Sequence, residues 1–277
     1  MSSLPVLACA VSDRPIITLT TDFGLRDPYV GAMKGVIASI APGASVFDIS
    51  HDVAPQDIEG GAFLIAAACP YYPSHAVHVG VVDPGVGTDR RPVAIATKRG
   101  TFVGPDNGLF SRVLLELGEA EVIDATLRGA RAFQLSDPGF HLPDVSATFH
   151  GRDIFAPVAA HLAVGVPPED VGVALQELSL GPLSIPEKSE GVVIGRITHV
   201  DRFGNAITNI SSDLLPVRAL IEVGGVVLQG IARTYQDGDL VALVGSAGVL
   251  EVAAREDSAA RILRLHPGDP CVVRTAV

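Results

Sequence analysis

The sequence predicts two domains of different class, an α/β domain followed by a smaller all-β domain with a barrel-like arrangement of strands. Across residues 14–181, apolar strand-like segments alternate with segments of helical period, an order that builds a mostly parallel central sheet. Across residues 190–277, short apolar segments alternate with glycine turns, as in small barrels and sandwiches. A polar, turn-rich stretch at 182–191 separates the two patterns.

Each element of the first domain has its own signal in the sequence. β-branched and other apolar residues in runs predict the strands, and apolar residues three or four positions apart predict the helices, of which the first opens at Asp27 and the second at Asp57. The expected strands cover 16–21, 45–49, 76–82, 92–97, 101–103 and 121–124, and the expected helices cover 28–41, 57–69, 109–117 and a segment ending at Leu162. Residues 132–145 show no clear period, so we expect a long loop there, and residues 132–147 match no motif.

The second domain is predicted from strand signals alone. Its apolar segments are short, rich in valine and isoleucine, and separated by Gly, Asn and Asp, which favour tight turns. The expected strands cover 192–200, 206–210, 219–223, 226–228, 240–244, 250–253 and 271–274.

The composition limits the classes of function. Hydrophobic residues make up 48% of the 277 residues and charged residues only 18%, so we expect apolar surface to be buried between subunits. No apolar run approaches the roughly 18 residues of a membrane span, and a net charge of −11 argues against nucleic acid, whose phosphates require a basic surface. Cys9, Cys69 and Cys271 form no CxxC motif, and the first ten residues lack the basic segment of a secretory signal, so we expect a reduced, cytoplasmic protein.

The most informative stretch is the loop at residues 83–91, between two buried apolar segments. It begins with Asp83, ends with Arg90 and Arg91, and contains glycines that let the backbone approach a ligand closely. Open α/β sheets place their chemistry at the carboxyl ends of strands, which is where Asp83 stands. The alternative is a tight loop in which Asp83 only caps the backbone or pairs with an arginine.

Asp83, Arg90 and His150 together could activate a water molecule. The arginine can stabilise negative charge, and either the acid or the histidine can accept a proton. The alternative for His150, which stands between Phe149 and Gly151, is a structural hydrogen-bonding role.

Other common motifs for cofactors and catalysis are missing from the sequence. His51-Asp52 and the pair His75 and His78 come nearest to a metal site, but no three-ligand cluster is visible, so we expect neither a metal nor a cofactor. The phosphate-binding patterns GxxxxGK[ST] and GxGxxG do not occur at a strand-helix junction, and the nucleophile elbow GxSxG does not occur. A triphosphate or dinucleotide ligand is therefore not expected.

Two turns of the second domain could contact a ligand. The turn at 201–205 offers an acid, an aromatic face for stacking and an amide, and the turn at 245–248 contains Ser246. The alternative for the first is an ordinary hairpin turn, in which Asp, Gly and Asn are common.

Five sequence motifs lie in order along the chain. They are TTDFG with DPYVG at 20–31, VDPGVGT with Arg90 at 82–90, GPDNG at 104–108, FHGRDIFAP at 149–157, and FGN with TNI at 203–210. Together they resemble those of the SAM hydroxide adenosyltransferases, the adenosine-forming S-adenosyl-L-methionine (SAM) hydrolases, which are related to the SAM-dependent fluorinase and chlorinase. The resemblance extends over roughly residues 16–265.

The resemblance implies a homotrimer with active sites at subunit interfaces. It implies that water or hydroxide attacks C5′ of SAM, giving adenosine and L-methionine without a metal, and that the water-activating set is Asp83, Arg90 and His150. It also implies substrate contacts from both domains: Asp22 on the ribose, Asp201 on the methionine ammonium, Phe203 against adenine, further contacts at Asn205, Ser246 and Glu251, and a backbone contact at Ala253 or Ala254.

The chain differs from the related halogenases at two points. It has the pair Asp83 and Arg90 where their halide pocket has none, and a negative Asp83 would repel a halide and favour water. It has Ala247 where they place an arginine near the methionine carboxylate, so the resemblance does not identify the group that binds this carboxylate. A SAM-dependent halogenase and a non-catalytic SAM- or adenosine-binding protein are the alternative functions.

Overall fold

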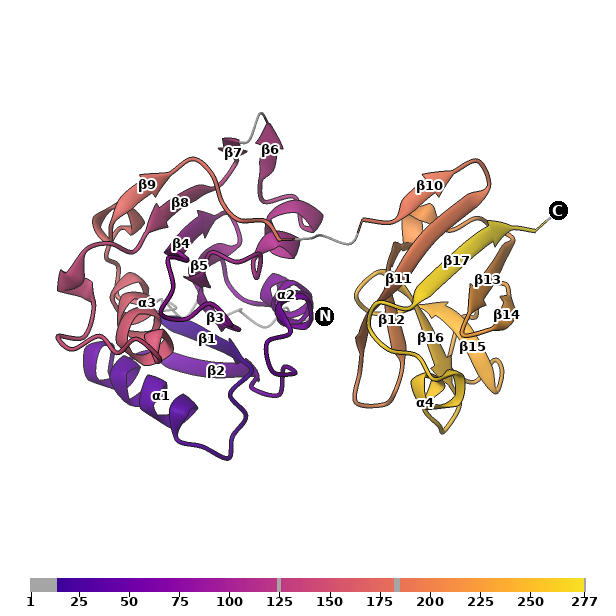
Figure 1. Cartoon of the computed structure of the whole chain (residues 1–277), viewed down its shortest axis with the longest axis horizontal. Helices are drawn as coiled ribbons and strands as arrows, with labels where there is room; N and C mark the ends of the chain where they lie inside the picture. Colours follow the sequence, from indigo (N-terminus) through magenta and orange to yellow (C-terminus); the bar gives the residue numbers. More distant parts are fainter. Residues whose placement is uncertain (1–13, 124–125, 182–184, 277) are drawn as a thin grey trace, which may run out of the picture. The chain divides into compact units, whose positions relative to one another are not determined.

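The computed structural model describes residues 14–123, 126–181 and 185–276. The chain divides into two compact units, Met1–Gly181 and Pro182–Val277 (Figure 1). Cys9, the first ten residues and Asp124 lie outside the described residues. No helix in the described parts of the chain is both long and apolar enough to cross a membrane.

A seven-stranded sheet forms the centre of the first unit. Its strands are β1 (Ile16–Thr21), β2 (Ser45–Ser50), β3 (Val77–Val81), β4 (Pro92–Thr97), β5 (Gly100–Pro105), β8 (Arg131–Gln134) and β9 (Val173–Leu175), and a separate hairpin holds β6 (Glu121–Ile123) and β7 (Thr126–Arg128). The order across the sheet is β2-β1-β3-β5-β4-β8-β9. The first four are paired in parallel, and β4, β8 and β9 are antiparallel to their neighbours. The predicted α/β class with a parallel sheet core is confirmed.

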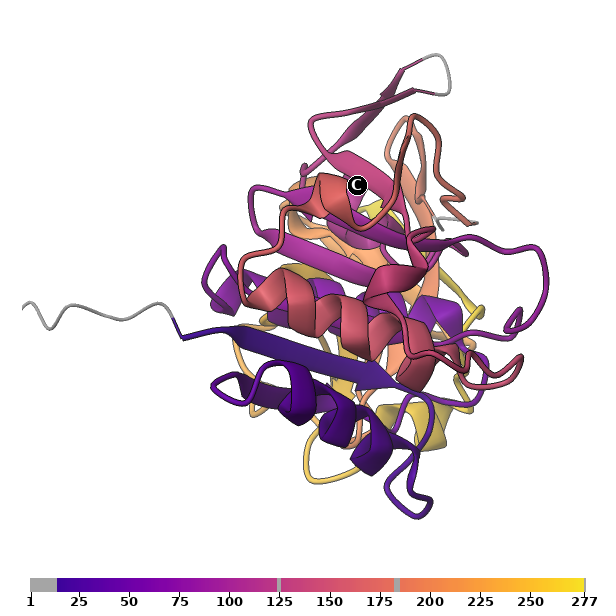
Figure 2. The same cartoon turned by 90° about the vertical axis from the view of Figure 1, so that its left-hand side faces the viewer.

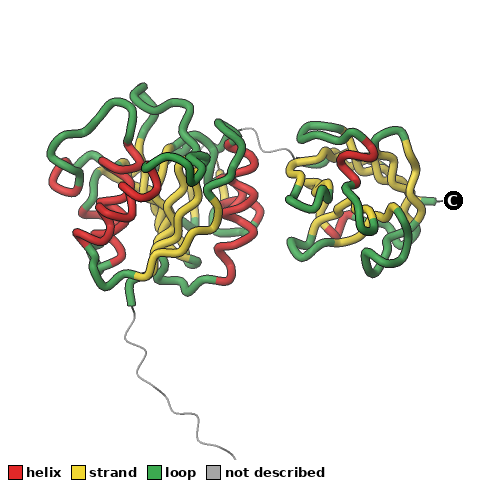
Figure 3. The backbone as a smooth tube through the Cα atoms, turned by 90° about the horizontal axis from the view of Figure 1, so that it is seen from below, coloured by secondary structure: helices red, strands yellow, loops and turns green. Residues whose placement is uncertain are grey.

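Helices cover both faces of this sheet (Figure 3). The α-helices are α1 (Tyr29–Ile40), α2 (Ile58–Ala68) and α3 (Ala156–Ala163), with π-helical turns at Arg112–Glu116 and Gly151–Phe155 and 3-10 turns at Cys69–Tyr71, Pro138–Phe140 and Pro168–Asp170. Helices α1 and α3 lie side by side on one face (Figure 2), and α2 packs with the first π-helical turn on the other. The central strands β1 and β3 are buried on both faces, as expected for a covered parallel sheet, whereas the edge strand β2 is partly exposed.

Some sequence predictions for the first unit need correction. The expected loop at 132–145 is wrong at its start, because β8 pairs with β4 and β9 and buries Ala132 and Phe133. A strand of four residues is too short to show a period, so its partners determine it. Asp57 starts and caps α2, whereas Asp27, expected to cap the first helix, does not: Pro28 occupies the N-cap position of α1 and no side chain caps that helix. The helix expected at 109–117 is shortened to the π-helical turn.

The second unit is an antiparallel, nearly closed barrel. Its strands are β10 (Glu187–Ser189), β11 (Val192–Val200), β12 (Ala206–Ser211), β13 (Ala219–Val223), β14 (Val226–Gln229), β15 (Leu240–Val244), β16 (Val249–Ala254) and β17 (Pro270–Thr275), with a 3-10 turn at Ser212–Leu214 and a short helix α4 (Ala259–Leu263). The strand order is β14-β13-β17-β11-β12-β16-β15, with β10 paired to β11. The N–H of Ala232, after β14, donates to the carbonyl of Ala242 on β15 at 2.8 Å, which brings the two ends of the sheet together. The predicted barrel-like class is confirmed, and β10 and α4 are additions.

Candidate active site

The loop at residues 83–91 joins β3 to β4 through a defined backbone path. The N–H and the hydroxyl of Thr88 both donate to the carbonyl of Gly85, at 3.1 and 2.7 Å. Gly87 has a φ of +78°, and a Cβ added there would lie 2.4 Å from the carbonyl oxygen of Ala147. Glycine is therefore required at this point, and the loop brings the acid at its start to the arginine at its end.

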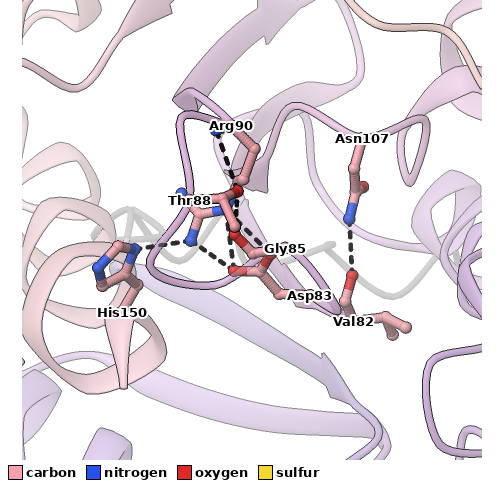
Figure 4. Close-up of polar contacts among 7 residues, drawn as sticks. All are labelled: Val82, Asp83, Gly85, Thr88, Arg90, Asn107 and His150. Carbon is pink, nitrogen blue, oxygen red and sulfur yellow. Dashed lines mark hydrogen bonds and ion pairs between the residues drawn. The ribbon is translucent and has the colours of Figure 1, made fainter. Parts of the chain in front are cut away.

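Asp83 and Arg90 form a bidentate, buried ion pair (Figure 4). The Nε of Arg90 donates to Oδ1 of Asp83 at 2.9 Å, and Nη2 donates to Oδ2 at 2.5 Å. Only 9% of the Arg90 side chain and 5% of the Asp83 side chain are exposed. The guanidinium also lies over the ring of Phe155, 5.3 Å from its centroid. Arg90 is thus fixed on two sides, which holds the carboxylate of Asp83 in one orientation.

His150 completes the cluster, and its proton can be assigned. Arg90 donates from Nη2 to Nδ1 of His150 at 2.7 Å, and because a guanidinium has no acceptor, Nδ1 must present its lone pair. Burial lowers the pKa of His150 and the charge of Arg90 lowers it further, against the opposing effect of Asp83 and Asp153. The ring is therefore neutral near pH 7 and carries its proton on Nε2, on the side of the ring away from Arg90 (Figure 4).

A pocket of about 430 Å³ in the first unit brings three predicted site residues together. It is lined by Asp22, Phe23, Tyr29, Pro55, Gln56, Val81, Asp83, Pro84, Val86, Thr148, Phe149, His150 and Gly151. Most of these residues follow the carboxyl ends of the parallel strands or start α1 and the second π-helical turn. Arg90 does not line the pocket and acts on it through Asp83 and His150.

Asp22 and an aromatic cluster form the rest of the pocket wall. Oδ2 of Asp22 accepts the N–H of Gln56 at 2.9 Å, and Gln56 has a left-handed backbone with φ +68°. The rings of Phe23, Tyr29 and Phe149 contact one another, with centroids 5.2–5.9 Å apart. The pocket thus combines two carboxylates, a neutral imidazole and apolar walls, a composition suited to a cationic or hydroxyl-rich small molecule.

In the second unit, the turn between β11 and β12 is organised by Asp201. Its Oδ1 accepts the N–H groups of Phe203 at 2.9 Å and of Asn205 at 2.8 Å, and its Oδ2 accepts the Nδ2 of Asn205 at 2.9 Å. Asn205 is buried, whereas the ring of Phe203 is 78% exposed. The backbone of residues 201–205 is therefore an ordinary hairpin turn, the alternative considered from the sequence. The turn also exposes the aromatic ring of Phe203.

Glu251 on β16 is a buried carboxylate close to this turn. The hydroxyl of Tyr235 donates to its Oε1 at 2.6 Å. Burial raises the pKa of Glu251, the hydrogen bond from Tyr235 lowers it, and the negative charge of Asp201 raises it again. The same hydrogen bond raises the pKa of Tyr235 to about 12. Asp201 and Glu251 thus form a negative cluster within the second unit.

The other predicted contacts of the second unit are less distinctive. Ser246 and Ala247 are exposed in the turn between β15 and β16. Ala253 and Ala254 are buried at the end of β16, where β15 pairs with both. The side chain of Ala254 packs in the main core of the barrel, and that of Ala253 packs in a small separate cluster with Val241 and Leu243. Only the backbone of the two residues therefore remains for a contact of the predicted kind.

Two of the histidines that came nearest to a metal pattern in the sequence have other partners in the structure. His51 lies 3.0 Å from Asp48 through Nε2 and contacts the hydroxyl of Thr21 through Nδ1 at 2.8 Å. His78 stacks on Phe102 in the core. Within the described residues, no group of three or more His, Cys, Asp or Glu side chains is placed to hold a metal ion.

Comparisons with known proteins assign the chain to a family. A model of the SAM hydroxide adenosyltransferase N-terminal domain matches residues 17–172, and a model of the corresponding C-terminal domain matches residues 195–272. The chain belongs to the SAM hydroxide adenosyltransferase family. The resemblance inferred from the five motifs is thereby confirmed.

Relatives of this chain include proteins named as hydrolases and as fluorinases. An (R)-S-adenosyl-L-methionine hydrolase from Thermus thermophilus is 46% identical over 93% of this chain and 98% of its own length. A fluorinase from an Actinoplanes species is 30% identical over 82% of this chain and 80% of its own length. A crystal structure of an uncharacterised conserved protein from Thermotoga maritima matches with a TM-score of 0.83 and 34% identity, covering 94% of this chain and 99% of that one.

The structure adds residues to the site that the sequence did not indicate. Pro55 and Gln56 line the pocket, although the stretch around them carries no motif. Tyr235 binds Glu251 from a loop that shows no signal of its own. Tyr29 and Phe149 also line the pocket, and they lie in the motifs DPYVG and FHGRDIFAP. Their aromatic side chains, close in sequence to Asp22 and His150, could have indicated this.

Proposed function

We propose that this protein hydrolyses S-adenosyl-L-methionine to adenosine and L-methionine. The observation that carries the proposal is the pocket of the first unit, in which Asp83, held by Arg90, faces the same space as Asp22 and the neutral His150. Family membership and the name of the Thermus thermophilus relative support the same reaction. A bidentate Asp83–Arg90 pair favours water over a halide as the nucleophile, because a carboxylate repels an anion.

The reaction balances with groups that this chain supplies. A water oxygen forms a bond to C5′ while the bond from C5′ to sulfur breaks. The electron pair of the broken bond stays on the sulfur, which becomes the neutral thioether of methionine. Asp83 accepts the proton of the water through Oδ1, which accepts a single Arg90 bond and keeps one lone pair free, whereas Oδ2 accepts two. His150 is then proposed to donate a hydrogen bond, whereas the sequence also allowed it to be a proton acceptor. Its Nδ1 is occupied, so it donates from Nε2 to the water oxygen and orients it.

The substrate contacts are proposed from both units. Asp22 accepts the ribose hydroxyls with the lone pairs that the Gln56 N–H leaves free. Phe203 stacks on adenine, Asp201 faces the methionine ammonium, and Asn205, Ser246, Glu251 and the backbone at Ala253 or Ala254 complete the set. The units proposed for these roles are residues 14–181 for water activation and 190–277 for adenosine and methionine binding.

The site is proposed to form between subunits of a homotrimer. The apolar composition and the large exposed ring of Phe203 support an assembly that covers this surface. Co-expression of Asp83→Asn and Phe203→Arg chains tests it, since each variant damages one unit only. Mixed trimers should recover activity that neither variant has alone, because some sites then combine two unmodified units. A monomer by light scattering, or no recovery on mixing, would contradict the shared site.

A cofactor and a metal have no part in this proposal. Activity should therefore persist after dialysis against EDTA, and a loss that one defined metal restores would contradict it. A cytoplasmic location stays a prediction from the cysteine pattern. Cys69 and Cys271 are free and buried.

One assay separates the proposed function from its alternatives. Wild-type protein is incubated with SAM and chloride or fluoride, and the nucleosides are separated by chromatography. Hydrolysis gives adenosine alone, a halogenase gives a 5′-halogenated nucleoside, and a binding protein gives neither. Asp83→Asn in parallel shows that any adenosine comes from this site.

A further inference from the structure

The motif GPDNG at 104–108 contributes no residue to the pocket wall, although it spans the carboxyl end of β5 and the turn that follows. Its Asp106 and Asn107 face the two ends of the catalytic loop instead. The Nδ2 of Asn107 donates to the carbonyl of Val82 at 2.9 Å (Figure 4). Val82 is the residue immediately before Asp83, so this bond fixes the start of the loop.

Asp106 holds the other end of the loop. Nε and Nη2 of Arg91 donate to Oδ2 of Asp106 at 2.8 and 2.5 Å, and the N–H of Asp106 donates to the carbonyl of Arg91 at 2.9 Å. Arg91 directly follows Arg90. Two adjacent residues of one turn therefore clamp both ends of the segment that carries the proposed base and its arginine.

The turn is itself fixed by the last residues of the first unit. Oδ1 of Asp106 accepts the N–H of Ser179 at 2.7 Å, and Nη2 of Arg91 donates to the carbonyl of Glu177 at 3.1 Å. Gly108 has a φ of +97°, and an added Cβ would lie 2.8 Å from the Cα of Gly181. The Asp106 side chain is 4% exposed, so its bonds are shielded from water.

We propose that Asp106 and Asn107 are positioning residues, which hold Arg91 and Val82 so that Asp83 and Arg90 keep their bidentate geometry. The kinetic part of this inference rests on the proposed hydrolysis, and its structural part does not. Small displacements of reacting groups cost much rate, so loosening either end of the loop should lower kcat. Substrate affinity should change less, because neither residue lines the pocket.

The test compares Asp106→Asn and Asn107→Ala with Glu119→Gln. Glu119 is a matched control: its side chain is 6% exposed, pairs with Arg99 at 2.9 Å and accepts the N–H of Lys98 at 3.0 Å, at the opposite end of β4 and β5. The two positioning variants should lower kcat by about tenfold to a hundredfold with a smaller change in KM. They should also speed amide hydrogen exchange in residues 84–90. Glu119→Gln should lower Tm without either effect.

Two results would overturn the proposal. One is a kcat loss in the positioning variants no larger than that in Glu119→Gln, and the other is unchanged exchange in residues 84–90. If Asp106→Asn does not fold, Arg91→Lys, which keeps the charge and loses the two-point bond, gives the same readouts. If the wild type makes no adenosine from SAM, the proposed function fails, and hydrogen exchange alone still decides whether the clamp exists.

Discussion

The loop at 83–91 and the turn at 201–205 use an aspartate in opposite ways. Asp83 is bound by a guanidinium, a charged group that fixes its orientation. Asp201 is bound by backbone and amide N–H groups of its own turn, which use the carboxylate to shape the chain. The first arrangement prepares a side chain for chemistry, and the second presents Phe203 to the outside.

This difference suggests which unit controls rate and which controls affinity. Of the groups proposed to activate water, Asp83 and Arg90 have buried side chains and His150 is half-buried, and the three are hydrogen-bonded to one another within the first unit. The aromatic group proposed to bind adenine is exposed in the second unit, so its burial requires a ligand and another surface. Variants of the water-activating set should therefore change rate, whereas variants of Asp22 and of the second unit should change affinity.

The largest effect is expected from Asp83→Asn. Loss of the proposed base should lower kcat by about 10²–10⁴, or roughly 3–5 kcal/mol of barrier, with little change in SAM affinity. Asp89→Asn is the control, since Asp89 is an exposed acid of the same loop. Single-turnover kinetics with separately measured SAM binding distinguishes the two parameters. Near-normal kcat in Asp83→Asn would exclude it as the base.

Acid should destabilise the first unit before the second. Among the described residues, both buried histidines, His51 and His78, lie in the first unit. Burial lowers the pKa of His78 to about 4, so the neutral ring stabilises the fold fully above pH 6.5, and this stability is lost as pH falls from 6.5 to 4. The loss is about 3 kcal/mol. Urea unfolding of wild type and His78→Gln at pH 7 and 4.5 measures it; equal pH dependence in both would contradict it.

The pH profile of kcat should follow the neutral state of His150. Because burial and Arg90 lower the pKa of His150, kcat should stay constant where an ordinary histidine titrates and fall only at more acidic pH. An NMR titration of the ring gives the pKa directly. A value above the ordinary one would mean that the ring is protonated and that its proposed tautomer is wrong.

A smaller effect is expected at the ribose. Asp22→Ala should weaken adenosine binding by about 1–3 kcal/mol, because a charged acceptor is lost. Calorimetry measures it, with the nearby exposed Asp27→Ala as control. Unchanged affinity would leave Asp22 with only its bond to the Gln56 N–H.

The smallest effect is expected from Phe203→Ala. Loss of one stacking contact should cost about 1 kcal/mol, close to fivefold in affinity, while Tm stays unchanged because the ring is exposed. Tyr71→Ala, at a ring that is 80% exposed and outside the proposed site, is the control. Equal affinities in the two variants would remove Phe203 from the site.

The sequence predicted the fold well where periodicity is strong and poorly where it is short. Long β-branched runs located β1 and β11 to the residue, whereas β8 and β9 are too short for a pattern and depend on their neighbours. For the site, residue chemistry selected Asp83, Arg90 and His150, and the fold brings all three together. The tautomer of His150 and the pocket contact of Gln56 depend on three-dimensional contacts that no sequence motif records.

The most direct test of the account is the fate of the water oxygen. SAM is hydrolysed by the wild-type protein in ¹⁸O-labelled water with chloride present, and the products are analysed by mass spectrometry. Attack at C5′ by water predicts one ¹⁸O atom in adenosine, at the 5′ position, and none in methionine. An ¹⁸O label in an amino-acid product, or a chlorinated nucleoside, would contradict the proposed reaction.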